Sequence, residues 1–119
     1  MQLDFLGDLR RTHTCGVLRS SDAGARVVLM GWVNRRRDLG NLIFIDVRDR
    51  TGITQLVFNK DKSAALHEKA STLRSEFVIA VTGNVKRRDP STINRNIATG
   101  EIEVVCEELR ILKDRKSVV

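Results

Sequence analysis

The sequence predicts an all-β domain with one helix, arranged as a five-stranded Greek-key barrel. Segments 42–48 and 77–88 alternate apolar and polar residues, which is the pattern of half-buried strands. A helical spacing of apolar residues occurs between the third and fourth predicted strands. One helix among many strands disfavours a fold of repeated strand–helix–strand units. The length of 119 residues suits one domain with one hydrophobic core.

The first three strands are predicted at residues 26–33, 42–48 and 53–59. The first is rich in β-branched and large apolar residues and is interrupted only by Gly31, as expected of a curved strand. It ends before the polar run 34–41. The second strand directs Ile43, Ile45 and Val47 to one face of the sheet. Turn residues separate the second and third strands, which therefore form a hairpin.

The remaining elements are a helix at 61–73 and strands at 77–88 and 101–112. Asp61 is a residue type that caps helices. The apolar stripe of the helix has three- and four-residue spacing and consists of Ala65, Leu66, Ala70 and Leu73. A polar loop containing Pro90, the only proline, separates the last two strands.

The order of three strands, a helix and two strands is that of the OB-fold, a partly open Greek-key barrel. The second and third strands of this barrel face single-stranded ligands. We therefore assign residues 25–114 to one OB-fold domain. Residues 1–24 are an N-terminal extension with a short helical turn near 16–19, and residues 115–119 begin a linker or are the end of a fragment.

Composition narrows the class of protein. Apolar residues make up 41% and charged residues 30% of the chain, as in globular domains. No apolar run approaches the roughly 20 residues that span a bilayer, and the N-terminus lacks a secretory signal. We expect a cytoplasmic protein without a membrane partner. The formal charge of +6 and the isoelectric point near 10.0 favour a polyanionic partner.

Motifs of catalysis and metal binding are missing from the sequence. Cys15 and Cys106 form no CxxC motif, which favours reduced, buried thiols over a zinc site or a disulfide. His13 and His67 are isolated and have no metal-ligand spacing. No Walker loop or GxGxxG supports nucleotide hydrolysis or dinucleotide chemistry. We expect no catalytic residue, no metal and no cofactor in this chain.

The alternation of residues 42–48 places Phe44 on the face that is not the core. An exposed ring can simply rest against a neighbouring element. Its context favours a function, because three arginines at 35–37 precede it and the basic residues Lys86 and Arg88 lie on a later strand. Cations that follow phosphates, together with a ring that stacks a base, are typical of single-strand binding.

Choice among bases requires side chains that hydrogen-bond to base edges. Gln55, Asn94 and Glu103 are suitable by type, although each can equally be a solvated polar residue. Glu103 is the most informative, because a carboxylate on the ligand face of a basic RNA binder repels phosphate. It fits better as the acceptor of hydrogen bonds from a guanine edge.

The segments RTHTCGVL, GWVNRRRDLGNLIFIDVRDRTGITQLVF, RSEFVIAVTG and INRNIATGEIEV resemble the N-terminal anticodon-binding domain of bacterial aspartyl-tRNA synthetases. The resemblance covers nearly the whole chain. It implies a class II ligase that uses ATP and Mg²⁺ to attach aspartate to tRNA, and a homodimeric parent protein. The catalytic domain is absent from this chain, so the resemblance implies an RNA-binding piece that is not catalytic by itself.

The resemblance also implies roles for individual residues. Phe44 stacks on the central anticodon base, and Gln55 and Arg37 contact anticodon bases. Arg88 helps to read the third base, and Glu103 recognises the first, a guanine or its derivative.

Further residues follow from the same resemblance. Lys86 and Asn94 support the splayed anticodon loop, with lysine at a position where the family often has arginine. Leu39, Ser91 and Thr92 flank the site that separates aspartate tRNA from asparagine tRNA. Ser91 and Thr92 depart from the family pattern, in which asparagine is common near position 92, so strict and relaxed tRNA choice both remain open.

Two other functions compete with this interpretation. The chain can be a free-standing OB-fold protein that binds single-stranded nucleic acid with little sequence preference. It can also be a structural domain that contributes to a dimer, since barrels of this kind also pack against partner subunits.

Overall fold

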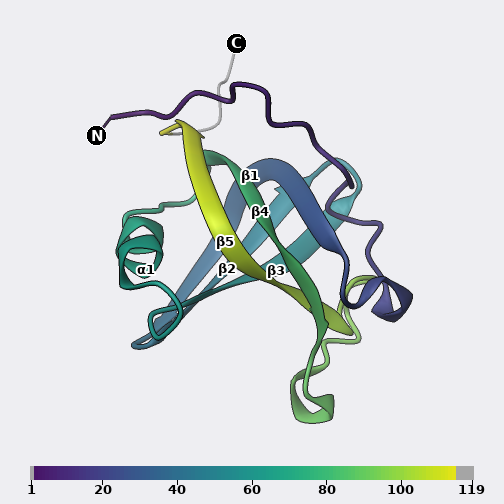
Figure 1. The fold of residues 1–119 in the computed structure, drawn as a ribbon. Helices are drawn as coiled ribbons and strands as arrows, with labels where there is room; N and C mark the ends of the chain where they lie inside the picture. The colour runs from purple at the N-terminus through teal and green to yellow at the C-terminus, as the bar shows by residue number, and fades with distance from the viewer. Residues whose placement is uncertain (1, 115–119) are drawn as a thin grey trace.

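A computed structural model describes residues 2–114 and shows a closed five-stranded barrel (Figure 1). The strands are hydrogen-bonded in the order β1-β2-β3-β5-β4. The predicted barrel with one helix is therefore confirmed. The elements in chain order are η1 (Ser20–Asp22), β1 (Arg26–Leu39), β2 (Leu42–Asp49), β3 (Gly52–Asn59), α1 (Ala64–Ser71), β4 (Val78–Arg87), η2 (Pro90–Thr92) and β5 (Ile102–Lys113).

The pairing of β5 closes the barrel. β1 pairs antiparallel with β2 and with β4, and β3 and β4 also have antiparallel partners. β5 pairs with β4 on one side and runs parallel to β3 on the other, where Leu56 faces Val104. This crossover places β5 beside the β2–β3 hairpin, so one outer face of the sheet combines residues that lie far apart in the chain.

The alternation along β2 has the predicted outcome. Ile43, Ile45 and Val47 are fully buried in the core, whereas Phe44 is half-buried and Arg48 is exposed on the outer face. α1 lies beside the barrel (Figure 1) and, with the residues that follow it, covers part of the core. The buried side chains of this region are Ala70 and Leu73.

The start of α1 differs from the prediction. Ser63, not Asp61, is the N-cap, and its hydroxyl accepts a hydrogen bond of 3.1 Å from the Leu66 amide. Asp61 lies in a turn instead, because the Asn59 side chain accepts a hydrogen bond from its amide. Since Asn and Asp side chains stabilise turns as readily as helix ends, composition did not distinguish the two caps.

β1 is longer than predicted, because it continues through the polar residues to Leu39. A β-bulge between Val33 and Arg35 shifts the register, and Arg35 then pairs with Asp46 and Arg37 with Phe44. Arg35 and Arg37 lie on the outer face of the sheet, whereas Arg36 pairs with the core residue Ile45 and donates to the Ser71 carbonyl at the end of α1. The bulge thereby brings Arg37 alongside Phe44.

The helical turn of the N-terminal extension lies at η1 and not at residues 16–19, so that prediction was wrong. The Arg19 amide donates to the Asp22 carboxylate at 2.8 Å, which places the turn after Arg19. Cys15 and Leu18 precede it and are fully buried in the barrel core. The extension is therefore packed against the barrel.

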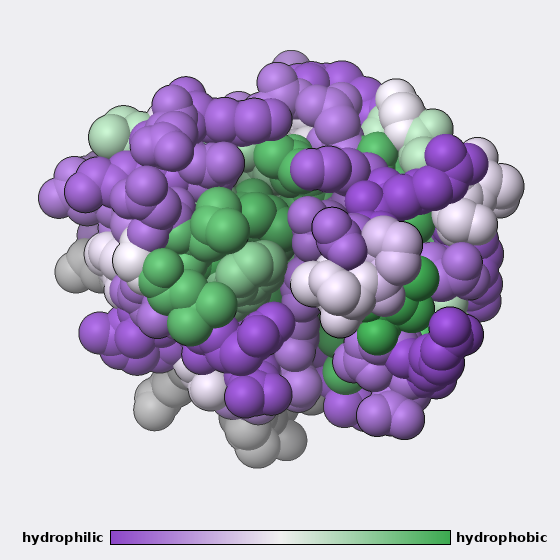
Figure 2. Space-filling view, turned by 90° about the horizontal axis from the view of Figure 1, so that it is seen from below, coloured by the Kyte–Doolittle hydropathy of each residue, from purple (hydrophilic) through white to green (hydrophobic). Residues whose placement is uncertain are grey.

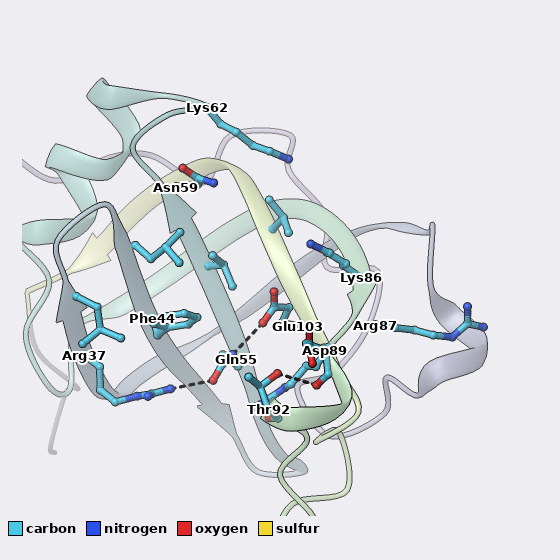
Figure 3. Close-up of a pocket in the computed structure, with 15 residues that line it drawn as sticks. Arg37, Phe44, Gln55, Asn59, Lys62, Lys86, Arg87, Asp89, Thr92 and Glu103 are labelled. Atoms are coloured by element: carbon cyan, nitrogen blue, oxygen red, sulfur yellow. Dashed lines mark hydrogen bonds between the residues drawn. The ribbon is translucent and has the colours of Figure 1, made fainter.

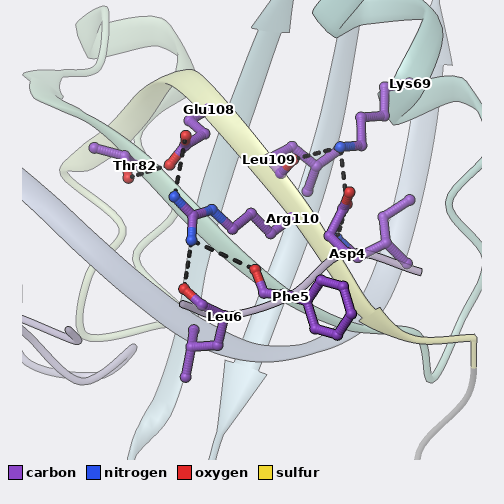
Figure 4. Close-up of polar contacts among 9 residues, drawn as sticks. Asp4, Phe5, Leu6, Lys69, Thr82, Glu108, Leu109 and Arg110 are labelled. Carbon is purple, nitrogen blue, oxygen red and sulfur yellow. Dashed lines mark hydrogen bonds and ion pairs between the residues drawn. The ribbon is translucent and has the colours of Figure 1, made fainter. Parts of the chain in front are cut away.

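The first described residues pass beside the C-terminal part of β5 (Figure 4). The Asp4 amide donates to the Ile111 carbonyl, the Asp4 carboxylate accepts from the Ile111 amide, and both distances are 2.8 Å. The same carboxylate forms a 2.8 Å ion pair with Lys69. The Lys69 hydrogen bond and the Ile111 amide lower the pKa of Asp4. Arg110 donates to the Leu6 carbonyl and holds the next turn of the segment.

Several further features concern the described part of the chain. None of the helices in residues 2–114 has the length and apolar character needed to cross a membrane. Within the same range, no three His, Cys, Asp or Glu side chains converge as a metal site. Cys15 and Cys106 are buried free thiols, as predicted. The predicted linker at 115–119 lies outside the described residues.

Candidate nucleic-acid interface

A cavity of about 600 Å³ lies on the outer face of the sheet. Its floor comes from β2, β3 and β5, and its walls come from β1, β4 and the segment around η2. Figure 2 shows the molecule from below, with a hollow of apolar side chains surrounded by hydrophilic ones. The apolar lining consists of Leu39, Leu42, Phe44, Val57 and Val105. Such a hollow can accept an apolar ring face while its rim contacts charged groups.

Phe44 lies in the floor of this cavity and is covered on one side by Arg37. The guanidinium carbon of Arg37 is 5.0 Å from the ring centroid, which is a cation–π contact. The two residues are cross-strand partners, so the register of β1 and β2 fixes the pair. The ring is half-buried and lies outside the core, which agrees with its predicted position.

Arg37, Gln55 and Glu103 form a hydrogen-bonded row across three strands (Figure 3). Arg37 donates to the Gln55 side-chain oxygen at 3.1 Å, and the Gln55 amide nitrogen donates to Glu103 at 3.0 Å. Gln55 is buried, so its amide orientation is set by these two partners. The row therefore presents ordered donors and acceptors beside the aromatic ring.

Arg88 also lines the cavity, and only 8% of its surface is exposed. Its side chain donates to the Ile102 carbonyl at 2.9 Å and to the Thr92 carbonyl at 3.2 Å. Burial lowers the pKa of Arg88, while the charges of Glu103 and Asp46 oppose that shift. Arg88 thus ties the segment around η2 to β5 and supplies positive charge to the cavity.

Asp46 balances the arginines of this face. It is half-buried between Arg35 on β1 and Gln55 on β3. Burial raises the pKa of Asp46, although the charges of Arg37, Arg35 and Arg88 act in the opposite direction. Asp46 thus lies among several guanidinium groups, whose charges favour its ionised form.

The rim of the cavity is basic. Lys86 on β4 faces the cavity from beside Glu103, its cross-strand partner, and Lys62 lies at the end near Asn59 (Figure 3). Arg87 extends away from the Phe44 ring (Figure 3). These exposed cations are suited to phosphate groups on the outside of a bound strand.

The cavity brings together eight of the ten predicted site residues: Arg37, Leu39, Phe44, Gln55, Lys86, Arg88, Thr92 and Glu103. Asn94 and Ser91 do not line it. The Asn94 side-chain oxygen accepts from the Asn96 amide, and the Ser91 hydroxyl donates to Asp89. Both therefore stabilise the β4–β5 loop in this structure, and their predicted contacts with RNA stay predictions.

The sequence interpretation missed other lining residues, namely Leu42, Val57, Asn59, Lys62, Arg87, Asp89 and Val105. Alternation was the signal for four of them. Val57 and Asn59 share the outward face of β3 with Gln55, Leu42 shares that of β2 with Phe44, and Val105 shares that of β5 with Glu103. Lys62 had no such signal, because it lies in the connection between β3 and α1.

The fold and the cavity define a class of protein, a small barrel with a nucleic-acid-binding face. Residues 27–112 match the tRNA anti-codon family, described as OB-fold nucleic acid binding domain. The chain belongs to this family.

Two curated relatives of the chain carry the name aspartate–tRNA(Asp/Asn) ligase. The chain is 58% identical over 114 residues to an aspartate–tRNA(Asp/Asn) ligase of Acidobacterium capsulatum, covering 96% of this chain and 19% of that protein. It is 53% identical over 115 residues to a ligase of the same name from Desulfosudis oleivorans, covering 97% of this chain and 19% of that protein. The chain thus spans about a fifth of the length of the curated relatives it matches.

Two solved structures are similar in fold. The asparaginyl-tRNA synthetase from Pyrococcus horikoshii, complexed with asparaginyl-adenylate, superposes with a TM-score of 0.73 and 28% identity, over 92% of this chain and 24% of that chain. OBody AM2EP06 bound to hen egg-white lysozyme superposes with a TM-score of 0.77 and 25% identity, over 91% of this chain and 96% of that chain.

Proposed function

We propose that this chain is the anticodon-binding domain of an aspartate–tRNA ligase and that its cavity holds the anticodon loop. The observation that carries the proposal is the row of Arg37, Gln55 and Glu103 beside the Phe44 ring. A ring alone stacks any base, whereas an ordered row of donors and acceptors beside it can select among bases.

The roles of the residues follow from their places in the cavity. Phe44 stacks the central base, and Arg37 and Gln55 bind base edges next to it. Glu103 accepts hydrogen bonds from a guanine at the first position, because an ionised carboxylate has acceptors and no donors. Arg88 supports the third position through the segment that it anchors.

Charge at the rim holds the RNA backbone. Lys86 lies between the cavity and solvent and supports the splayed loop as a point charge, with Asn94 contributing from the β4–β5 loop. Leu39 and Thr92 line the cavity, and Ser91 is next to Thr92. We assign the distinction between aspartate and asparagine tRNA to these three residues.

The remainder of the proposed ligase supplies the chemistry. ATP and Mg²⁺ bind in a catalytic domain outside this chain, where aspartate is attached to tRNA. The proposed parent enzyme is a cytoplasmic homodimer. This chain contributes recognition of the anticodon and has no catalytic residue of its own.

Binding of RNA stem-loops tests the proposal. We expect the chain to bind a stem-loop with an aspartate anticodon more tightly than one with a scrambled loop at the same salt concentration. Each mismatched base contact typically costs about 1–3 kcal/mol. Equal affinity for both loops would leave only general single-strand binding, and absence of binding to either would favour a structural domain.

A further inference from the structure

We infer that a second nucleotide-binding subsite lies on the same outer face, around Arg48 and Ile53, and that it binds an RNA nucleotide adjoining the anticodon triplet. This inference rests on the proposed function, because it extends the path of the same RNA. A cavity of about 200 Å³ at this place is lined by Arg48 and Ile53 together with Gly16, Thr51, Ala98 and Thr99.

The subsite continues the row of outward residues that begins in the main cavity. Phe44 and Arg48 lie four residues apart on β2 and on the same face. At about 3.3 Å per residue, their backbones are about 13 Å apart along the strand. This distance exceeds the step of about 3.4 Å between stacked bases of one nucleic-acid strand. The two positions therefore serve different nucleotides of one RNA.

The chemistry of the subsite suits a nucleobase. The planar guanidinium group of Arg48 is exposed and can stack on a base, and Ile53, its cross-strand partner, provides an apolar floor. Trp32 is the cross-strand partner of Arg48 on the other side, so the basic residue is flanked by two large apolar neighbours. A cation and an apolar surface side by side are the features that hold an unpaired nucleotide.

Backbone rather than polar side chains forms the nearby wall. A Cβ atom on Gly16 would lie 2.3 Å from the Thr51 carbonyl oxygen, so the two segments approach too closely for a side chain there. The Thr51 hydroxyl accepts from the Gly16 amide, and the Thr99 hydroxyl donates to the Ile53 carbonyl. Because these hydroxyls are engaged within the protein, the subsite binds a base by stacking and charge with little preference for its identity.

The length of strand that OB-folds bind also supports the inference. One OB-fold binds about 4–16 nucleotides of a single strand, more than the three of an anticodon. When the anticodon triplet fills the main cavity, the neighbouring nucleotides therefore still need binding positions elsewhere on the barrel. The outward face of β2 leads from the Phe44 cavity to Arg48, and Arg35 follows the same direction on β1.

The test compares two RNAs on the purified chain at one salt concentration. The first is the trinucleotide GUC, and the second is a seven-nucleotide RNA with GUC at its centre. We expect Arg48→Ala to weaken binding of the seven-nucleotide RNA by at least about fivefold, the lower limit for one stacked base. Binding of the trinucleotide should change by less than about twofold, since it does not reach Arg48.

Two matched variants identify the cause. Arg50→Ala removes the same charge from an exposed residue that does not line the subsite, and it should leave the ratio between the two RNAs unchanged. Arg48→Lys keeps the positive charge but lacks the planar guanidinium group. It should therefore retain only part of the affinity for the seven-nucleotide RNA. Equal losses from Arg48→Ala and Arg50→Ala would show general electrostatic attraction and overturn the subsite.

A seven-nucleotide RNA with abasic flanking positions separates the base from the phosphate. It should bind wild-type protein as weakly as the intact RNA binds the Arg48→Ala variant, and the two changes should not add. The single tryptophan, Trp32, gives an independent signal, because its emission should change with the seven-nucleotide RNA and not with GUC.

The outcomes for the two proposals are distinguishable through Phe44→Ala. If this change weakens both RNAs while Arg48→Ala weakens neither, only the second subsite is refuted. If Phe44→Ala leaves both affinities unchanged, the proposed anticodon cavity itself is refuted.

Discussion

The Arg37 guanidinium lies 5.0 Å from the centroid of the Phe44 ring, and this pair forms one wall and the floor of the cavity. Arg37 also donates to Gln55, so its position is fixed by two contacts from two strands. The ring is therefore held ready for a base on its open side, next to a cation. This arrangement leads to the first prediction.

Replacement of Phe44 by Ala should weaken binding of an aspartate-type stem-loop by about 1–3 kcal/mol, because one stacked base loses its platform. Phe44→Tyr keeps the aromatic face and should retain most of the affinity. Fluorescence anisotropy with labelled RNA measures both. Unchanged affinity of the Ala variant, with its fold intact by circular dichroism, contradicts the stacking role.

Replacement of Glu103 by Gln should remove the preference for guanine at the first anticodon position. The amide group of the new glutamine can point a donor at the donors of guanine. The difference in binding free energy between guanine and adenine loops should therefore fall by about 1–3 kcal/mol. Competition between two stem-loops that differ only at that base measures it. Glu101→Gln is the control, because Glu101 is exposed and does not line the cavity. A preference that persists in the Glu103 variant would assign guanine recognition elsewhere.

Replacement of Arg88 by Ala should lower the free energy of unfolding by about 2 kcal/mol, because the buried Ile102 carbonyl loses its charged donor. Urea denaturation measures this change. Arg87→Ala removes the neighbouring exposed charge and should shift stability by less than about 0.5 kcal/mol. If Arg88→Ala weakens RNA binding without loss of stability, Arg88 reads the RNA directly and does not act through the η2 segment.

Replacement of Asp4 by Asn should destabilise the protein by about 0.2–1 kcal/mol at neutral pH, through loss of the ion pair with Lys69. The pKa of Asp4 is lowered in the folded state, so its contribution is complete above the unfolded value of about 3.9. This stabilisation is lost as the pH falls through the lowered pKa of Asp4 in the folded protein. Urea denaturation at several pH values should show the two proteins converging in acid.

The control for Asp4 is Asp8→Asn, which removes the same charge from an exposed residue of the same segment. It should change the free energy of unfolding at neutral pH by less than about 0.5 kcal/mol. A constant difference between wild type and the Asp4 variant at every pH would refute the electrostatic explanation.

Much of the fold followed from local patterns. The alternation along β2 separated Ile43 and Ile45 from Phe44 correctly, because successive residues of a strand point to opposite faces. Element boundaries were less predictable. β1 continues to Leu39 because its polar residues are hydrogen-bonded to β2. The β-bulge between Val33 and Arg35 shifts the pairing register, and no local sequence pattern indicates it.

The site was predictable in residue type and less so in arrangement. Resemblance to a family named Gln55 and Glu103, but their hydrogen bond depends on the crossover that places β5 beside β3. Asn94 and Ser91 form hydrogen bonds within the β4–β5 loop, and their predicted roles toward RNA stay predictions. Lys62 lines the cavity only because the connection to α1 passes its edge.

By itself, the sequence determined the barrel class, the outward position of Phe44 and the basic character of its surroundings. These properties depend on spacing and composition, which act over a few residues. Only the tertiary structure decided that Arg37 covers the ring, that Gln55 links it to Glu103, and that Arg88 is buried as a support. Contacts of this kind join strands that are distant in the chain, and they exist only once the register and the crossover of the barrel have formed.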